Sequence, residues 1–143
     1  DVFACLGARA FHTGPSGTGA QMKLVTNLVL GLNRAALAEG LAFAEARGLA
    51  AEPTLEILRG SLAYSRIMDT KGRKMVTEDF TPQARLSQHL KDVRLMLAAT
   101  ALKLPLTEAH RGLLEQAEAL GCGELDNSAI RRAYPPAECR RSD

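Results

Sequence analysis

A lysine and an asparagine four residues apart stand at the start of a long apolar run in this 143-residue chain. They are Lys23 and Asn27, and they follow a turn-forming segment that contains Gly14, Gly17 and Gly19. Four residues make about one turn of an α-helix, so the two side chains project from one face and can contact the same small molecule. An amine beside an amide is suited to moving a proton and to orienting a hydroxy acid. The spacing therefore predicts a candidate site at the start of this helix.

Simpler explanations exist for both features. A dinucleotide fingerprint needs a preceding strand and an acidic residue about twenty positions later, and the glycine segment lacks that context, so a tight turn against a ligand or a neighbouring domain explains it equally well. Lys23 could extend its amine into solvent from the helix start. However, Asn27 and Arg34 lie at nearly the same helical angle and continue a polar stripe along an apolar helix. The residues alone leave both explanations of Lys23 open.

A second charged segment lies in the middle of a later predicted helix. Lys91 and Asp92 fall on or beside its solvated side, and an exposed charge pair is the simplest interpretation. The buried stripe of that helix is predicted to contain Leu86, Leu90, Val93 and Leu97. Asp126 is expected to be a helix N-cap. The three histidines, His12, His89 and His110, are far apart in sequence and have no carboxylate spacing for a metal, so we assign them no chemistry and predict no metal site.

Composition is that of one ordinary globular domain, with 46 % apolar and 24 % charged residues and a formal net charge of +2. This small and scattered charge argues against a nucleic-acid surface, and no apolar run is long enough to span a membrane. Cys5, Cys122 and Cys139 are too few and too scattered for a disulfide framework, which favours a reducing, cytoplasmic setting. Because the chain begins with Asp1 rather than Met, we expect it to be a piece of a longer protein.

The pattern of apolar residues predicts an all-α fold of six or seven helices around one long buried helix, from Ala20 to about Arg47. Residues 1–13 are expected to be the remnant of, or link from, a preceding domain, residues 14–134 the helical domain, and residues 135–143 a flexible tail. Gly48 is predicted to end the long helix. The remaining helices are expected at residues 52–59, 62–69, 72–76, 83–102, 107–120 and 126–134.

Three motifs together resemble the C-terminal domain of the β-hydroxyacid dehydrogenases, the family of 3-hydroxyisobutyrate dehydrogenase and tartronate semialdehyde reductase, which is related to 6-phosphogluconate dehydrogenase. The motifs are Gly14-x-x-Gly17-x-Gly19-x-x-x-Lys23-x-x-x-Asn27, then Leu90-Lys91-Asp92, and finally Gly123-Glu124-Leu125-Asp126-Asn127-Ser128-Ala129. They cover residues 14 to about 134 in order and spacing. One position departs from the pattern: many relatives carry an aromatic residue seven positions before the lysine of the Lys-Asp pair, where this chain has Ala84.

The resemblance implies an all-α domain that completes the substrate site of an enzyme whose separate Rossmann domain, absent from this chain, binds NAD or NADP. The family's catalytic lysine falls on Lys23, its substrate-contacting asparagine on Asn27 and its cofactor-contacting lysine on Lys91. The implied reaction interconverts a small 3-hydroxy acid and its semialdehyde, with Lys23 as general acid and base. We expect a homodimer or homotetramer, and no hydride transfer by this chain alone. The alternative is a non-catalytic dehydrogenase-like helical module that serves dimerisation or another interaction.

Overall fold

The computed structural model describes residues 11–135, so the expectations for residues 1–10 and 136–143 fall outside the described residues. It contains α1 (Thr18–Ala46), α2 (Ala51–Arg59), η2 (Met68–Gly72), α3 (Arg73–Thr77), α4 (Leu86–Ala98), α5 (Pro105–Ala117), η3 (Glu118–Cys122) and η4 (Asn127–Ala133). The π-helical segments η2 and η3 adjoin α3 and α5, and η4 is a 3-10 helix. The described residues therefore form six helical rods and, apart from one isolated bridge between Arg85 and Asp126, no β-structure. The expected all-α fold is confirmed.

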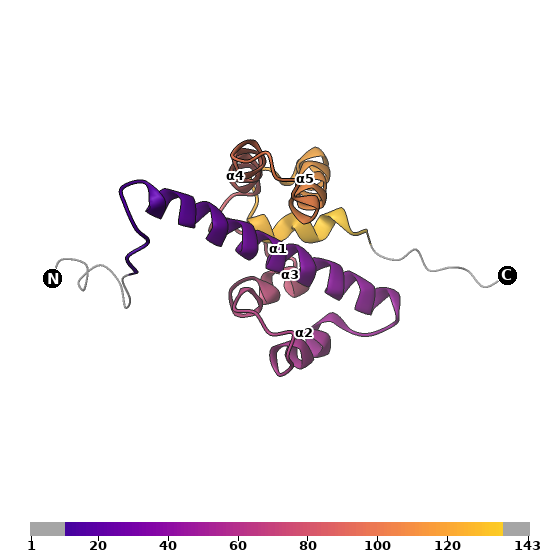
Figure 1. Cartoon of the computed structure of the whole chain (residues 1–143). Helices are drawn as coiled ribbons and strands as arrows, with labels where there is room; N and C mark the ends of the chain where they lie inside the picture. Colours follow the sequence, from indigo (N-terminus) through magenta and orange to yellow (C-terminus); the bar gives the residue numbers. More distant parts are fainter. Residues whose placement is uncertain (1–10, 136–143) are drawn as a thin grey trace.

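The long helix α1 is the axis of the domain (Figure 1). On one side of it lie α4 and α5, on the other side lie α2 and α3, and η4 packs near the centre against α1, α4 and α5. The first turns of α1 extend beyond the other helices.

Glycines in left-handed conformation define both ends of α1. Gly17 precedes the helix with a φ of 95°, and Gly48 follows it with a φ of 80°. After the last turn, the Leu49 amide donates to the Ala44 carbonyl and the Gly48 amide to the Glu45 carbonyl, both at 2.9 Å, which satisfies two carbonyls at the helix end. Both ends lie close to the positions predicted from the sequence.

Burial along α1 differs from the expectation that nearly every face is covered. The second half is buried, with Leu37 at 3 % and Leu41 at 0 % exposure, whereas Val25 and Val29 in the first half are 54 % and 51 % exposed. Only one face of that first half, which includes Leu24 and Leu28, packs against the core. The reason is geometric: α1 reaches past the helices that would cover its other faces.

Two other predicted helices have different limits because tertiary contacts compete with local helix formation. The helix predicted at residues 83–102 begins only at Leu86, since the preceding segment is held in extended form by hydrogen bonds to the segment before η4: the Asp126 amide donates to Phe80 and the Asn127 amide to Ala84. The helix predicted at residues 62–69 is wrong for most of its length, because residues 62–66 form turns and irregular backbone. Its last residues instead join the piece predicted at residues 72–76 in one continuous helical rod formed by η2 and α3. The predicted buried stripe of α4 is confirmed, with Leu86, Leu90 and Val93 at most 1 % exposed.

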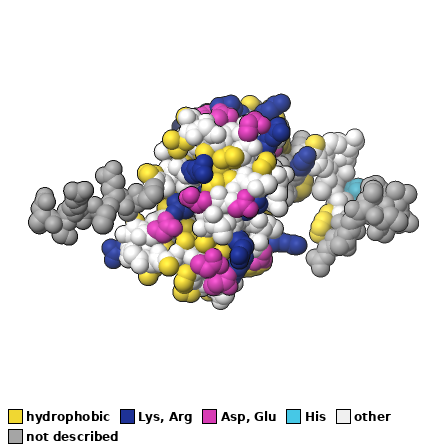
Figure 2. All heavy atoms as spheres, turned by 180° about the vertical axis from the view of Figure 1, so that it is seen from behind, with side chains coloured by type: hydrophobic (Ala, Val, Ile, Leu, Met, Phe, Trp, Pro, Cys, Tyr) yellow, Lys and Arg dark blue, Asp and Glu magenta, His cyan; other side chains and the backbone are white. Residues whose placement is uncertain are grey.

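The surface mixes charges of both signs. On the face shown in Figure 2, basic and acidic side chains alternate with apolar ones over the body of the domain. Within residues 11–135, no helix has both the length and the apolar character that a membrane crossing requires.

Candidate active site

Lys23 and Asn27 lie one turn apart in the exposed first half of α1, as their spacing predicted. The Lys23 side chain is exposed, and Asn27 is half-buried. The Lys23 amine is therefore accessible to a molecule that approaches this end of the domain. Asn27 lies where the exposed part of α1 meets the packed helices.

Asn27 lines a hollow of about 200 Å³ that we call the α1–α4 pocket. Its wall is built from three parts of the chain that are distant in sequence. The lining residues are Asn27, Leu30 and Arg34 of α1, Ala84 and Arg85 before α4, Gln88, His89 and Asp92 of α4, and Asn127 at the start of η4. This volume is below the roughly 300–1,000 Å³ of typical ligand pockets, so the hollow has room only for a small molecule. Ala84, the position that departs from the expected family pattern, lines this pocket with a small side chain.

Lys91 lies on α4 beside this pocket but not in its wall. Its side chain is exposed, while the neighbouring Asp92 is half-buried and lines the pocket. The simple interpretation of an exposed charge pair thus describes Lys91 but not Asp92. Of the three residues predicted for the site, Asn27 belongs to the pocket wall, and Lys23 and Lys91 are accessible on the two helices that contribute to it.

Three polar side chains that sequence reasoning left without a common role meet at the pocket wall: Arg34 and His89 line the pocket, and His110 packs against His89. Arg34 is only 2 % exposed, and the rings of His89 and His110 lie against each other with centroids 5.2 Å apart. The Nε and Nη1 atoms of Arg34 and the Nε2 atoms of both histidines are buried without a hydrogen-bond partner in the part of the chain that the structure describes. Gly31 makes room for the two rings, because a Cβ there would lie 2.6 Å from His110 Cε1. The histidines are separated by twenty-one positions, so no short-range sequence pattern could predict that their rings are in contact.

The charge states of this cluster follow from its burial. Burial lowers the pKa of Arg34 to about 10, although Asp126 opposes the shift, so the guanidinium is still charged at neutral pH. Burial and the Arg34 charge lower the pKa of His89 to about 3 and that of His110 to about 4, and the neighbouring His110 adds to the shift of His89. Both imidazoles are therefore neutral at pH 7. The cluster contains one cation and no anion.

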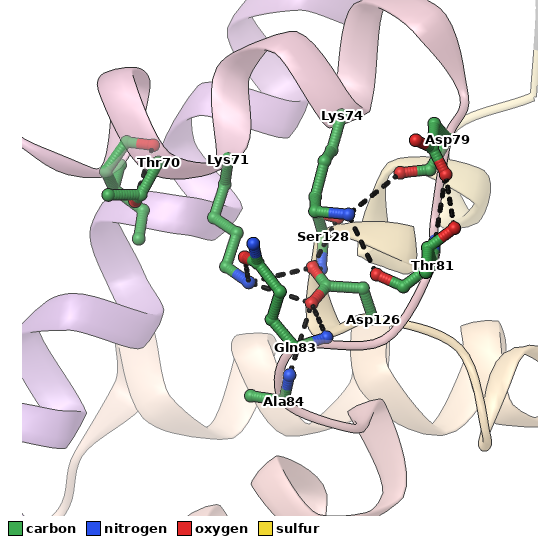
Figure 3. Close-up of polar contacts among 10 residues, drawn as sticks. Thr70, Lys71, Lys74, Asp79, Thr81, Gln83, Ala84, Asp126 and Ser128 are labelled. Carbon is green, nitrogen blue, oxygen red and sulfur yellow. Dashed lines mark hydrogen bonds and ion pairs between the residues drawn. The ribbon is translucent and has the colours of Figure 1, made fainter.

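A buried ion pair joins two segments that contribute to the pocket wall (Figure 3). Lys71 Nζ lies 2.8 Å from Asp126 Oδ2, and the Asp126 carboxylate also accepts hydrogen bonds from the Gln83 and Ala84 amides and from Ser128. Burial alone would raise the pKa of Asp126, but the hydrogen bonds from Lys71, Ser128 and Gln83 outweigh it and hold that pKa below its usual range. The N-cap predicted at Asp126 is confirmed, because its side chain accepts from the Ser128 amide. The same carboxylate fixes the segments that carry Ala84 and Asn127 into the pocket wall.

Nothing in this geometry forms a metal centre: among residues 11–135 there is no group of three or more potential ligands close enough to hold an ion. Residues 17–134 match the family described as the NAD-binding domain of NADP-dependent 3-hydroxyisobutyrate dehydrogenase. The chain belongs to this family. The resemblance predicted from the three sequence motifs is thereby confirmed, as is the NAD(P) cofactor class of the family.

The proteins similar to this chain include both reductases and a nuclear factor. Glyoxylate/succinic semialdehyde reductase 1 of Arabidopsis thaliana is 35 % identical over 92 % of this chain and 47 % of its own length. The cytokine-like nuclear factor N-PAC of Aedes aegypti is 34 % identical over 90 % of this chain and 23 % of its own length. A crystal structure of 3-hydroxyisobutyrate dehydrogenase from Salmonella typhimurium superimposes with a TM-score of 0.77 at 25 % identity, over 81 % of this chain and 42 % of that one. The chain thus spans less than half the length of each.

Proposed function

We propose that this chain is the helical substrate domain of an NAD(P)-dependent oxidoreductase that interconverts a small 3-hydroxy acid and its semialdehyde. The observation that carries the proposal is the accessible Lys23 amine one helical turn from Asn27, which lines a pocket of small-molecule size. The membership of the chain in a dehydrogenase family supports the same reaction class. The amine and one side of the pocket wall thus belong to the same helix.

In the proposed mechanism, Lys23 acts on the proton of the substrate hydroxyl. In the oxidation direction, the neutral amine accepts that proton at Nζ while the carbinol carbon loses a hydride and becomes a carbonyl. In reduction, the ammonium form returns the proton to the carbonyl oxygen. Asn27 orients the oxygen through its side-chain amide. NAD or NADP supplies the hydride acceptor or donor when it is bound.

Two exposed cations near the pocket are suited to binding one part of this anionic cofactor. Lys91 and Arg85 are exposed cations at the first turns of α4, and Lys91 is the one that matches the family motif. We propose that Lys91 contacts the cofactor from this domain. Lys91→Ala should then weaken cofactor binding in a fluorescence titration of the full-length protein, while unfolding free energy changes little because the side chain is exposed. Arg94→Ala, a charge loss on the same helix outside the pocket, is the control, and equal affinity of both variants would contradict the role.

The central test is Lys23→Ala in the full-length protein that contains this chain. A positioned proton-transfer group contributes about 10²–10⁴-fold to rate, so kcat should fall by at least the lower figure while cofactor affinity persists. Lys103→Ala, which removes an exposed lysine from the segment between α4 and α5, should retain wild-type turnover. Turnover is followed as absorbance of the reduced cofactor. Near-normal kcat in Lys23→Ala would remove the proposed mechanism.

The second candidate is a non-catalytic dehydrogenase-like module for interaction or dimerisation, which the similarity to N-PAC favours. This chain has Lys23 one helical turn from Asn27, whereas a non-catalytic module would have no need of such a pair. A full-length protein that binds neither NAD nor NADP and that turns over no hydroxy acid would support the second candidate against the first.

A further inference from the structure

The unpaired Arg34 guanidinium in the wall of the α1–α4 pocket is the least expected feature of the domain. Arg34 is 2 % exposed, lines the pocket, and makes no hydrogen bond or ion pair with any described residue. A buried charge without a partner is strongly unfavourable, so such groups are normally paired or bind a ligand. The arrangement therefore needs an explanation beyond packing.

No described side chain neutralises this charge. Asp126, the acid that acts on Arg34 through its charge, already accepts hydrogen bonds from Lys71, Ser128 and two backbone amides. Asp92 lines the same pocket, but no ion pair joins it to Arg34. The adjacent histidines are neutral at pH 7. Arg34 therefore keeps free donors next to a hollow.

We propose, on the basis of the function proposed above, that Arg34 binds a carboxylate of the substrate at the end remote from the reacting carbon. Guanidinium donors match a carboxylate in a two-pronged hydrogen-bonded arrangement, which would pair Nη2 with one of the two donors, Nε or Nη1, that the protein leaves without a partner. Asn127, whose Oδ1 is buried without a partner in the same wall, can accept from a hydroxyl of the same ligand. The substrate class is then a hydroxy acid whose carboxylate is joined to the reacting carbon through at least one further carbon atom.

Helix geometry supports the remote position. Arg34 is seven residues beyond Asn27, which is a rise of about 10 Å, and long helical side chains lean back toward the N-terminus by about one turn. The guanidinium thus lies roughly one turn deeper along α1 than Asn27. A carboxylate directly on the reacting carbon would be too close to Lys23 to reach it.

Calorimetric titration of the full-length protein that contains this chain with succinate tests the assignment without any catalytic step. Wild-type protein should bind succinate saturably and should bind the neutral analogue succinamide at least about tenfold more weakly. Arg34→Met, which removes the charge but keeps a long apolar side chain, should lose at least about tenfold in succinate affinity, and Arg34→Lys should lose less. Arg94→Met removes one exposed positive charge outside the pocket and should bind succinate as the wild type does.

Denaturant unfolding of Arg34→Met separates a binding role from a folding role. Replacing an unpaired buried cation by an apolar side chain should leave the unfolding free energy unchanged or higher. Absence of succinate binding by the wild type, or equal affinity in Arg34→Met, would overturn the inference, and tighter binding of inorganic phosphate than of succinate would overturn the assignment to a carboxylate. Because the titration involves no turnover, its failure is distinct from normal kcat in Lys23→Ala, which would refute the proposed function instead.

Discussion

Gly31 provides a direct test of how the buried histidine pair is packed. An added Cβ at this position would lie 2.6 Å from His110 Cε1 and 2.7 Å from His89 Nε2, closer than such contacts occur in proteins. Both rings are buried, so neither can swing into solvent to relieve the clash. Gly31→Ala should therefore force α1 away from α4 and α5, or push the rings off their preferred rotamers.

Gly40 offers a matched control in the same helix. A Cβ at Gly40 meets nothing within 4 Å, so Gly40→Ala should stabilise the protein by about 0.5–1 kcal/mol through helix propensity alone. Gly31→Ala gains the same propensity but adds an overpacking penalty of about 1–3 kcal/mol. The unfolding free energy of Gly31→Ala should thus lie about 1–3 kcal/mol below that of Gly40→Ala.

Urea unfolding of the purified chain, followed by far-ultraviolet circular dichroism, measures this difference. The double variant Gly31→Ala/His110→Ala should recover part of the loss attributable to the clash, which a double-mutant cycle isolates. Equal stability of the two single alanine variants, or a coupling energy of zero in the cycle, would refute the close packing of Gly31 against the histidines.

Three further outcomes follow from the structure. Lys71→Met leaves the buried Asp126 carboxylate unpaired and should cost about 3–5 kcal/mol in urea unfolding, whereas Lys74→Met, at a more accessible lysine, should cost far less. The folded-state pKa values of His89 and His110 lie below the ordinary 6.5, so the unfolded state binds more protons than the folded state between about pH 4 and 6.5. The unfolding free energy measured by urea titration should therefore fall with decreasing pH in that window, by up to about 1.4 kcal/mol per pH unit for each histidine. A flat profile would contradict the buried neutral pair. The exposed apolar side chains in the first half of α1 should drive self-association into at least a dimer, which light scattering would refute by finding a stable monomer at micromolar concentration.

Features that depend on neighbours in sequence were predictable. The all-α class, the limits of α1 at its flanking glycines and the buried stripe of α4 all follow from local periodicity and turn chemistry, and the structure agrees with each. The juxtaposition of Lys23 and Asn27 is of the same kind, since four residues on a helix always share a face. Their roles in catalysis, and that of Lys91, are still predictions.

The late start of α4 shows the limit of local reasoning. Residues 83–85 have no sequence signal that forbids a helix, yet they are extended because Asn127 and the Asp126 carboxylate bind their backbone groups. Likewise, the exposed first half of α1 has the composition of a buried helix, and only the arrangement of the other helices reveals which faces stay uncovered.

The sequence by itself determined the all-α class, the limits of the long helix, the family of the domain and the pairing of an amine with an amide on one helical face, because each is encoded in spacings of a few residues or in ordered motifs. Only the tertiary structure decided that Arg34, His89 and His110 meet at one pocket and that Lys71 pairs with Asp126, fifty-five positions away. These contacts join helices that are distant along the chain, and their partners are selected by the packing of whole helices around α1. Whether a buried charge such as Arg34 has a partner depends on residues from several helices, so only the tertiary structure can show that it has none among the described residues.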